Sequence, residues 1–420
     1  MRSPDPSPSV APSLGTAVMG RLDIVAGLTD EPGALTRLFL SPAHKAAARQ
    51  VGAWMEAAGM RVALDAAGTM VGRYEGDRPG APALLLGSHI DTVRNAGRYD
   101  GNLGVVTAIA AVSELHARGI RRPFAVEVLA FGDEEGVRFP VTLTGSRALA
   151  GGFDPKALEC RDGDGISLRQ ALRDFGLTPE GLPLLARSPA DVLGYLEVHI
   201  EQGPVLEAED LPVGIVTAIA GAARYGVVVE GAAGHAGTVP MGLRRDAAAA
   251  TAEMILAVEA VALAEAGLVA TVGTVEVPRG AVNVIAAETR FTIDIRSPDD
   301  TIRGRALAEI VTRFDAIAAR RGVSYAKSSF YETPAVACAP GLVAAIEAGI
   351  RRLGIRPRRL PSGAGHDGLA LAALCPIGMI FVRCAGGISH SPRESITAED
   401  ADAAARLLVD ILSHFDPATR

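Results

Sequence analysis

The fold of this chain is decided by residues 83–135, which read ALLLGSHIDTVRNAGRYDGNLGVVTAIAAVSELHARGIRRPFAVEVLAFGDEE. Two short apolar runs, Ala83–Leu86 and Ala125–Phe131, flank a helical stretch at Val105–Arg118. Short continuous apolar runs are typical of strands buried on both faces, and a helix between two of them indicates a βαβ unit. A third run at Gly194–His199 adds another strand. The sequence therefore predicts an α/β fold with a mostly parallel, helix-covered sheet.

Polar side chains begin where each of these three runs stops. They form the sequences His89-Ile90-Asp91, Asp133-Glu134-Glu135 and His199-Ile200-Glu201. In open α/β sheets the chemistry gathers at the carboxyl ends of the strands. Three strand ends therefore bring imidazoles and carboxylates, the usual metal ligands, to one edge of the predicted sheet.

The first cluster combines a histidine with two aspartates. Asp91 lies two residues after His89, so its carboxylate is expected to accept the N–H of the second ring nitrogen and fix the imidazole for a metal. Asp100, in Gly97-Arg98-Tyr99-Asp100-Gly101, has two oxygens that could bridge two ions. A His-x-Asp sequence alone is more often a plain polar turn, and only the other clusters favour a metal site.

The second cluster places three acids side by side. Adjacent carboxylates repel one another, so they are either solvated at the surface or held by cations. The apolar strand before them favours a site, with Glu135 as a metal ligand. Metal-assisted hydrolysis also needs a base within hydrogen-bond reach of the attacking water, and Glu134 suits that task.

Two further histidines follow the same pattern. His199 ends the third strand, and His390 follows a buried-type strand at Ile377–Val382 after a glycine turn. A lone histidine is more often a surface or hydrogen-bonded residue than a ligand, but these two share the predicted sheet edge. Imidazole and carboxylate together favour Zn²⁺, Mn²⁺, Co²⁺ or Ni²⁺ over Ca²⁺ or Mg²⁺.

The chain of 420 residues is too long for one ordinary core. We predict a catalytic domain of residues 21–213 and 327–420, and an inserted α+β domain of residues 214–326. Residues 1–20 are predicted to be a disordered tail, and a helical pattern runs from Leu22 to Gly59. The insert is expected to contain strands and helices at Arg224–Glu230, Arg245–Ala264, Val269–Val277, Thr289–Arg296 and Thr301–Arg321.

Composition argues against several partners. The net charge of −7 provides no basic field for a polyanion, so no nucleic acid is expected. No apolar run is expected to reach the roughly 18 residues of a membrane helix, and the first residues lack an apolar signal core. The four cysteines are scattered without a Cys-x-x-Cys pair, which argues against a thiolate zinc site and fits reduced thiols in the cytoplasm.

The order and spacing of these residues resemble the dinuclear metallopeptidase and aminoacylase clan, and within it the hydantoinase/carbamoylase group, from about Arg21 to Phe415. That group contains allantoate amidohydrolases, N-carbamoyl-L-amino-acid hydrolases, ureidoglycolate amidohydrolases and β-ureidopropionases. The motifs that mark it are His199 with Glu201-Gln202-Gly203-Pro204, Gly234-His235-Ala236-Gly237, and Ser362-Gly363-Ala364-Gly365-His366-Asp367.

The resemblance implies a ligand set for two divalent ions per subunit, Zn, Mn, Co or Ni. One ion is held by His89, Asp100 and His199, and the other by Asp100, Glu135 and His390, so that Asp100 is the bridge. The protein is accordingly expected to be a hydrolase with a dinuclear metal site.

The resemblance also implies the catalytic groups around the metals. Glu134 is the general base and acid, and Asp91 is the partner of His89. His235 reaches the active site of the other subunit and steadies the oxyanion, which makes a homodimer part of the catalytic apparatus and the insert both lid and dimer interface.

A carboxylate clamp is implied for the substrate. Arg296, Asn283 and Gln202 resemble it, because a guanidinium pairs bidentately with a carboxylate and amides add hydrogen bonds without charge. Alternatively, Arg296 is a surface cation paired with Asp294 or Asp299. His366 either lines the pocket or belongs to a purely structural turn.

The expected activity is hydrolysis of the C–N bond of a small ureido compound that carries a carboxylate. Allantoate is the first choice, and an N-carbamoyl-L-amino acid or ureidoglycolate is the alternative. A peptidase or aminoacylase is a more remote possibility, and so is an inactive relative that only binds such a ligand or serves as a dimeric scaffold.

Overall fold

The computed structural model describes residues 13–417, and its contacts divide the chain into two compact units. The first unit comprises Met1–Thr217, Cys338–Leu360 and His366–Arg420, and the second comprises Ala218–Ala337 and Pro361–Gly365. The second unit thus begins four residues later than the predicted insert at 214 and extends beyond its predicted end at 326. The predicted tail residues 1–12 lie outside the described residues.

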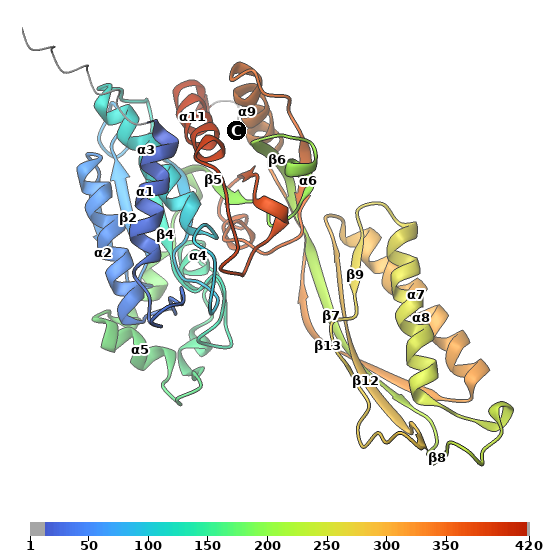
Figure 1. Ribbon diagram of the computed structural model, residues 1–420. Coiled ribbons are helices and arrows are strands. Elements are labelled where there is room, and N and C mark those ends of the chain that lie inside the picture. Colours follow the sequence, from blue (N-terminus) through green and yellow to red (C-terminus); the bar gives the residue numbers. More distant parts are fainter. Residues whose placement is uncertain (1–12, 418–420) are drawn as a thin grey trace, which may run out of the picture. The chain divides into compact units, whose positions relative to one another are not determined.

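The first unit is built on a mixed sheet in the strand order β1-β2-β4-β3-β5-β16-β6 (Figure 1). The four strands β4, β3, β5 and β16 are parallel, which confirms the α/β class with a mainly parallel sheet. The strands are β1 (Arg61–Leu64), β2 (Met70–Tyr74), β3 (Ala83–His89), β4 (Ala125–Phe131), β5 (Val192–Ile200), β6 (Val213–Ile219) and β16 (Ile377–Val382).

The register of the parallel strands brings their carboxyl ends together. His89 pairs with Phe131 across β3 and β4, and His199 pairs with Phe381 across β5 and β16. Every residue of β3, β4, β5 and β16 is buried, as expected for strands covered on both faces. The strand ends predicted to carry the chemistry therefore lie at one edge of the sheet.

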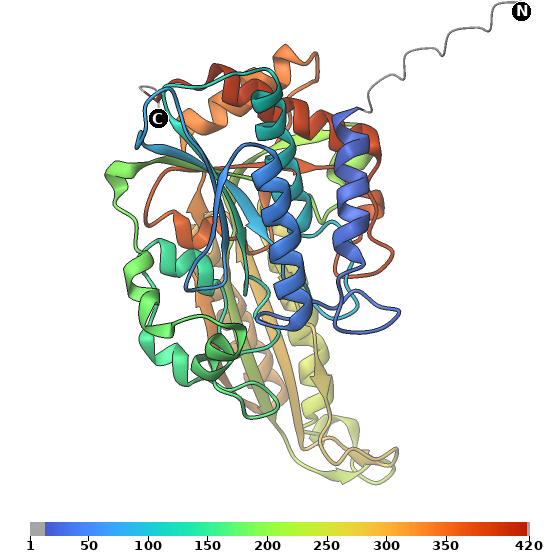
Figure 2. The ribbon, with the colours of Figure 1, turned by 90° about the vertical axis from the view of Figure 1, so that its left-hand side faces the viewer.

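Helices pack on this sheet and on one another. Helix α3 contacts β3, β4 and β5, and it lies next to α1 and α2 (Figure 2). Helices α9 and α11 contact each other and β16. The helices of the unit are α1 (Leu14–Ala26), α2 (Pro42–Ala57), α3 (Asn102–Ala117), α4 (Thr144–Leu149), α5 (Leu168–Phe175), α6 (Val205–Ala208), α9 (Pro340–Arg352), α10 (Gly368–Leu371) and α11 (Ala398–His414).

The beginning of the chain differs from the prediction. Residues 14–20 form the first part of α1, with Ser13 as N-cap, and do not belong to a tail. Val18 and Leu22 are buried, and α1 packs against α11 and α3. The predicted helical stretch from Leu22 to Gly59 is two helices separated by residues 27–41, because Ser41 starts a new helix as its N-cap.

The second unit is a two-layer α+β structure. Strands β7 (Gly221–Glu230), β12 (Glu288–Ser297) and β13 (Ser324–Thr333) form an antiparallel sheet, and α7 (Ala247–Ala264) and α8 (Asp300–Arg321) lie side by side against it (Figure 1). Strand β13 was not predicted, because its residues are almost all exposed and show no apolar alternation. The shorter strands and those at the boundary are β8 (Gly234–His235), β9 (Val269–Thr271), β10 (Val275–Glu276), β11 (Val284–Ile285), β14 (Val336–Ala337) and β15 (Arg359–Ser362).

Helix α7 corrects one statement made from the sequence. Among residues 13–417 it is the one helix that is long and apolar enough to cross a membrane by length and composition. Its residues Ala250, Met254, Val258 and Val261 are nonetheless buried in the core of the second unit. Core packing accounts for this apolar face.

Candidate metal centre

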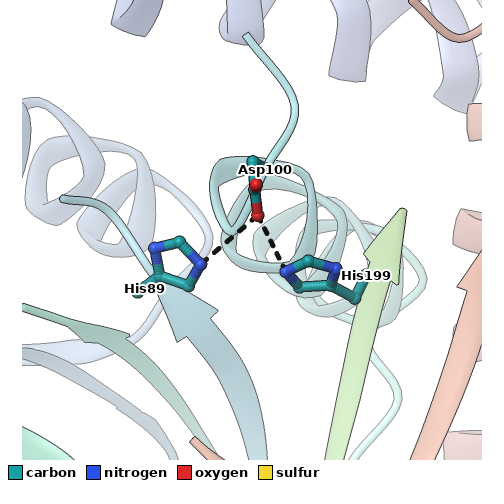
Figure 3. Close-up of side chains that lie close together, drawn as sticks. All are labelled: His89, Asp100 and His199. Atoms are coloured by element: carbon teal, nitrogen blue, oxygen red, sulfur yellow. Dashed lines mark ion pairs between the residues drawn. The ribbon is translucent and has the colours of Figure 1, made fainter. Parts of the chain in front are cut away.

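Two buried histidines face one aspartate at the edge of the sheet. His89 ends β3 and His199 lies next to the end of β5, and each side chain is 2% exposed. The Nε2 atoms of His89 and His199 lie 3.6 Å and 3.0 Å from the same oxygen, Oδ1 of Asp100 (Figure 3). Two adjacent strands and the loop before α3 thus supply one three-residue group.

Backbone carbonyls fix both rings. His89 Nδ1 lies 3.0 Å from the carbonyl oxygen of Asp91, and His199 Nδ1 lies 2.9 Å from that of Ile200. In each ring Nδ1–H donates and Nε2 is left to face Asp100. The expected partner of His89 was the carboxylate of Asp91, but the nearer carboxylate oxygen is 3.7 Å away.

The Asp91 carboxylate instead binds the loop Asp133-Glu134-Glu135, here called the acid loop. It accepts the backbone N–H groups of Glu134 at 3.2 Å and Glu135 at 3.3 Å. Asp91 is buried, and burial raises the pKa of its carboxyl group. One residue thus orients His89 through its carbonyl and the two glutamates through its side chain.

The second oxygen of Asp100 faces a loop. His390 Nε2 lies 3.2 Å from Oδ2 of Asp100 and 3.8 Å from Oε1 of Glu135. Although burial favours the neutral form, hydrogen bonds with His199, His390 and His89 hold the pKa of Asp100 well below its usual value. Asp100 is therefore a carboxylate placed between three imidazoles, with one oxygen for each side.

The two half-buried glutamates, Glu134 and Glu135, have carboxyl groups with perturbed acidity. Burial, followed by the Asp100 carboxylate, raises the pKa of Glu135 to about 7. Burial also raises the pKa of Glu134 well above its usual value, although His89 opposes this. Such carboxyl groups are unstable as anions unless positive charge is nearby.

The arrangement fits divalent metal ions. Three groups of residues have ligand atoms that all lie within 4.8 Å of one another, and their mixture of imidazole and carboxylate is that of Zn²⁺, Mn²⁺, Co²⁺ and Ni²⁺ sites. At Gly101, where φ is 64°, a Cβ would lie 2.5 Å from the His89 ring, so the backbone leaves room only for the ring. The groups are His89, Asp100 and His199; Asp100, Glu135 and His390; and His89, Glu134 and Glu135.

Comparisons with known proteins identify the family of this chain. The model of the peptidase family M20/M25/M40 matches residues 85–414. The chain belongs to this family. It is 44% identical to the N-carbamoyl-L-amino acid amidohydrolase of Geobacillus stearothermophilus, over 90% of this chain and 92% of the relative. It is 40% identical to the allantoate deiminase of Arabidopsis thaliana, over 94% of this chain and 81% of the relative.

A solved structure places the chain within the family. The amidase of the hydantoinase/carbamoylase family from Burkholderia multivorans superposes with a TM-score of 0.89 at 33% identity, covering 95% of this chain and 97% of that one. The chain is a member of this group of M20-family amidohydrolases and a hydrolase of non-peptide C–N bonds. Enzymes of the family bind divalent metals, for which the groups described above are the candidate ligands.

Two predicted substrate residues of this M20-family chain lie in the first unit. Gln202 donates from Nε2 to Oδ2 of Asp100 at 3.0 Å, and its Oε1 is buried without a hydrogen-bond partner among the described residues. His366 is 1% exposed and packs edge-on against the His199 ring, with centroids 4.5 Å apart. Both residues therefore contact the candidate ligands.

His235 and Asn283 lie together in the second unit. His235, in β8, pairs with Val284 of β11, and the carbonyl of Asn283 accepts the N–H of Ala236 at 2.9 Å. His235 is exposed, and its Nδ1 accepts the N–H of Gly237 at 3.1 Å. A neutral His235 therefore carries its proton on Nε2, where it can be donated.

Arg296 is already engaged within the second unit. Its Nε and Nη2 donate to the two oxygens of Asp294, each at 2.8 Å, and Nη1 donates to the carbonyl of Gly363 at 2.8 Å. Arg224 shares the same carboxylate, with Nε 2.9 Å from Oδ2. The pairing with Asp294, which the sequence left as an alternative, is therefore present.

The sequence missed three polar residues around the centre, of which Glu197 and Glu394 are buried and Ser389 is half-buried. Glu197 accepts the Ser88 hydroxyl at 2.8 Å, and Glu394 and Ser389 contact Asp100 or its loop. A glutamate in an apolar strand is a signal that could have revealed Glu197, because such residues are rarely buried without a partner. Nothing comparable marks Glu394, which follows His390 in a polar loop.

Proposed function

We propose that this chain is a metal-dependent amidohydrolase that cleaves the C–N bond of a small ureido compound with a carboxylate. Allantoate is the first substrate to test, and N-carbamoyl-L-amino acids and ureidoglycolate are the alternatives. The observation that carries the proposal is Asp100, a buried carboxylate with imidazoles on both oxygens and the half-buried Glu135 beside it. The amidohydrolase relatives support the reaction class.

Two divalent ions are proposed to bind with Asp100 as the bridge. His89 and His199 complete one set, and Glu135 and His390 complete the other. When bound, such ions lower the pKa of water and polarise a carbonyl oxygen. Their positive charge also favours the anionic forms of Glu134 and Glu135, which desolvation alone disfavours.

Glu134 is proposed to be the general base and acid. Its backbone is held by the Asp91 carboxylate, and its own carboxyl group is buried beside His89. In that position it can accept a proton from the attacking water and deliver it to the leaving nitrogen. The geometry also groups Glu134 with His89 and Glu135 as a possible ligand, so its role needs a direct test.

The second unit is proposed to be a lid and dimerisation domain. Its helix α7 exposes Leu256 (62%) and Leu263 (82%), which lie seven residues apart on one face. Exposed large apolar side chains on one helix face are typical of an interface.

Two roles are proposed for residues of the second unit in a homodimer. His235, with a proton on Nε2, would stabilise the oxyanion in the partner's site. Arg296, with Asn283 and Gln202, would bind the substrate carboxylate.

A substrate panel tests the reaction. Ammonia release would be measured with allantoate, ureidoglycolate, N-carbamoyl-L-amino acids and β-ureidopropionate, with Mn²⁺, Zn²⁺, Co²⁺ or Ni²⁺ supplied to metal-stripped protein. We expect release from at least one of them, dependent on metal. Activity restricted to acyl amino acids or peptides would instead indicate an aminoacylase or peptidase. A protein that neither retains metal nor turns over any of these substrates would be an inactive relative.

Mixing two inactive variants tests the shared site. His235→Ala and Asp100→Ala proteins would be inactive alone, whereas a mixed dimer contains one site with an intact metal centre and an intact partner histidine. We expect partial recovery of activity after subunit exchange. Two folded variants that exchange subunits without any recovery would contradict the proposed role of His235.

A further inference from the structure

The Asp100 loop and the His390 loop are tied together by Glu394. We propose that Glu394 is a positioning residue that sets the spacing of Asp100 and His390, and thereby controls binding of the ion assigned to Asp100, Glu135 and His390. We call this ion the loop ion, and the ion of His89, Asp100 and His199 the strand ion. The inference rests on the metal centre proposed above.

One carboxylate connects the two loops. Glu394 is 4% exposed, and its Oε1 accepts the backbone N–H groups of Tyr99 at 2.8 Å and Asp100 at 3.1 Å. Its Oε2 lies 3.2 Å from the hydroxyl of Ser389, the residue before His390. Glu394 therefore holds the backbone of the bridging aspartate with one oxygen and the neighbour of the loop histidine with the other.

Ser389 extends this link to the side chain of Asp100. Its hydroxyl lies 3.0 Å from Oδ2 of Asp100 and accepts from Nε2 of Gln202 at 2.9 Å. A hydroxyl has one proton, so at any moment Ser389 donates either to Asp100 or to Glu394. The oxygen of Asp100 that faces His390 is thus oriented by the residue that Glu394 holds.

The Glu394 side chain is tightly packed against the loop that carries Asp100. A Cβ on Gly97 would lie 2.3 Å from the carboxyl carbon of Glu394, so the glycine lets the loop approach the buried side chain. His390 itself adopts a left-handed backbone conformation with φ of 53°, which costs a non-glycine residue energy. Surrounding contacts have to maintain this conformation, and the Glu394–Ser389 link is one of them.

The loop ion depends on this link more than the strand ion does. His89 and His199 are positioned by strands and backbone carbonyls, whereas His390 has no strand to hold it. Loss of Glu394 is therefore expected to free His390 from its position and to reorient the bridging carboxylate of Asp100. His89 and His199, the two histidines of the strand ion, should stay in place.

Glu394→Ala tests the proposal by counting ions. Mn²⁺ would be titrated into metal-stripped protein by calorimetry, and metal content would be measured after gel filtration. We expect the loop ion to bind about 10- to 100-fold more weakly, the usual effect of removing a group that orients a ligand, and the strand ion to remain. Asp65→Ala is the matched control, because Asp65 also accepts two backbone N–H groups, from Ala67 at 2.8 Å and Thr69 at 2.9 Å, in a turn between β1 and β2.

Two milder variants keep the test decisive if Glu394→Ala does not fold. Glu394→Gln retains an oxygen for the backbone N–H groups and should bind the loop ion nearly as the wild type does. Ser389→Ala removes the hydroxyl that contacts Glu394, Asp100 and Gln202, and it should weaken that ion alone. Unchanged affinity for the loop ion in every folded Ala variant would overturn this inference and leave the metal centre standing. A wild-type protein that binds fewer than two ions would overturn the metal centre and this inference together.

Discussion

The two halves of the candidate metal centre are built differently. His89 and His199 end strands of a buried sheet, have 2% of their side chains exposed, and have Nδ1 facing a backbone carbonyl. His390 lies on a loop, has 51% of its side chain exposed, and adopts a positive φ. Asp100 is the residue the two halves share.

Because of this difference, we expect the two halves to bind their ions with different affinities and to differ in how strongly a mutation changes that affinity. Strand ends fix side chains before a metal arrives, so the proposed strand ion would have little ordering entropy to overcome. The loop half has to be ordered by contacts among side chains, above all those of Glu394 and Ser389. We therefore expect the strand ion to bind first, and the loop ion to respond more to mutation.

Asp100→Ala should have the largest effect, because it removes the part that both halves use. We expect neither ion to be retained after gel filtration and activity to fall below detection. His390→Ala is the matched comparison, since it should lose the loop ion and keep the strand ion. Retention of two ions by Asp100→Ala, measured by metal analysis, would show that Asp100 is not the bridge.

Glu134→Gln should separate catalysis from metal binding. If Glu134 is the base, the variant keeps both ions and kcat falls by about 10²–10⁴-fold, the usual contribution of a positioned proton-transfer group. If Glu134 is instead a ligand of the group with His89 and Glu135, the variant loses an ion along with its activity. Metal analysis beside the kinetics decides between these roles.

The loop ion should bind more tightly as the pH rises. The hydrogen bond to Asp100 raises the pKa of His390 to about 9, so a metal has to displace a proton from this histidine below that pH. Its apparent affinity should rise by about tenfold per pH unit towards pH 9. A pH-independent affinity between 7 and 9, measured by Mn²⁺ titration, would remove His390 from the ligand set.

The proton on His390 should also affect the stability of the metal-stripped protein, which should fall, not rise, as the pH increases. A histidine whose folded pKa is raised stabilises the folded state fully below its ordinary value of 6.5 and loses that contribution as the pH rises through about 9. His390→Ala removes this term, so its thermal unfolding should show a smaller decline over that range than the wild type does.

The sequence predicts the strand half better than the loop half. The runs that became β3, β4 and β5 are recognisable because strands buried on both faces are apolar throughout, and parallel strands bring their carboxyl ends to one edge. His89 and His199 follow from that rule alone. The buried-type strand and glycine turn before His390 indicated a place near the same edge, but its pairing with Asp100 depends on tertiary structure and was implied only by the resemblance to a known family.

Elements held by distant partners were missed for the same reason. Helix α1 pairs with α11, almost 400 residues further along the chain, as the hydrogen bond between Gly15 and Asp402 shows. Strand β13 exposes both faces and gives no periodic signal. Asp91 lies where it was expected, but its carboxylate turned towards the acid loop, which local spacing does not reveal.

The smallest effect should appear in the stability of the metal-stripped protein. His390 is half exposed, so above about pH 9, where its raised pKa no longer adds stability, His390→Ala should change the free energy of unfolding by only a few tenths of a kcal/mol, roughly the surface-site range of ±0.5 kcal/mol. His199→Ala removes a buried ring that contacts Asp100, the carbonyl of Ile200 and the ring of His366, and should cost about 1–3 kcal/mol. Denaturant unfolding of both variants gives the comparison, and equal losses would mean that the strand half is no more rigidly built than the loop half.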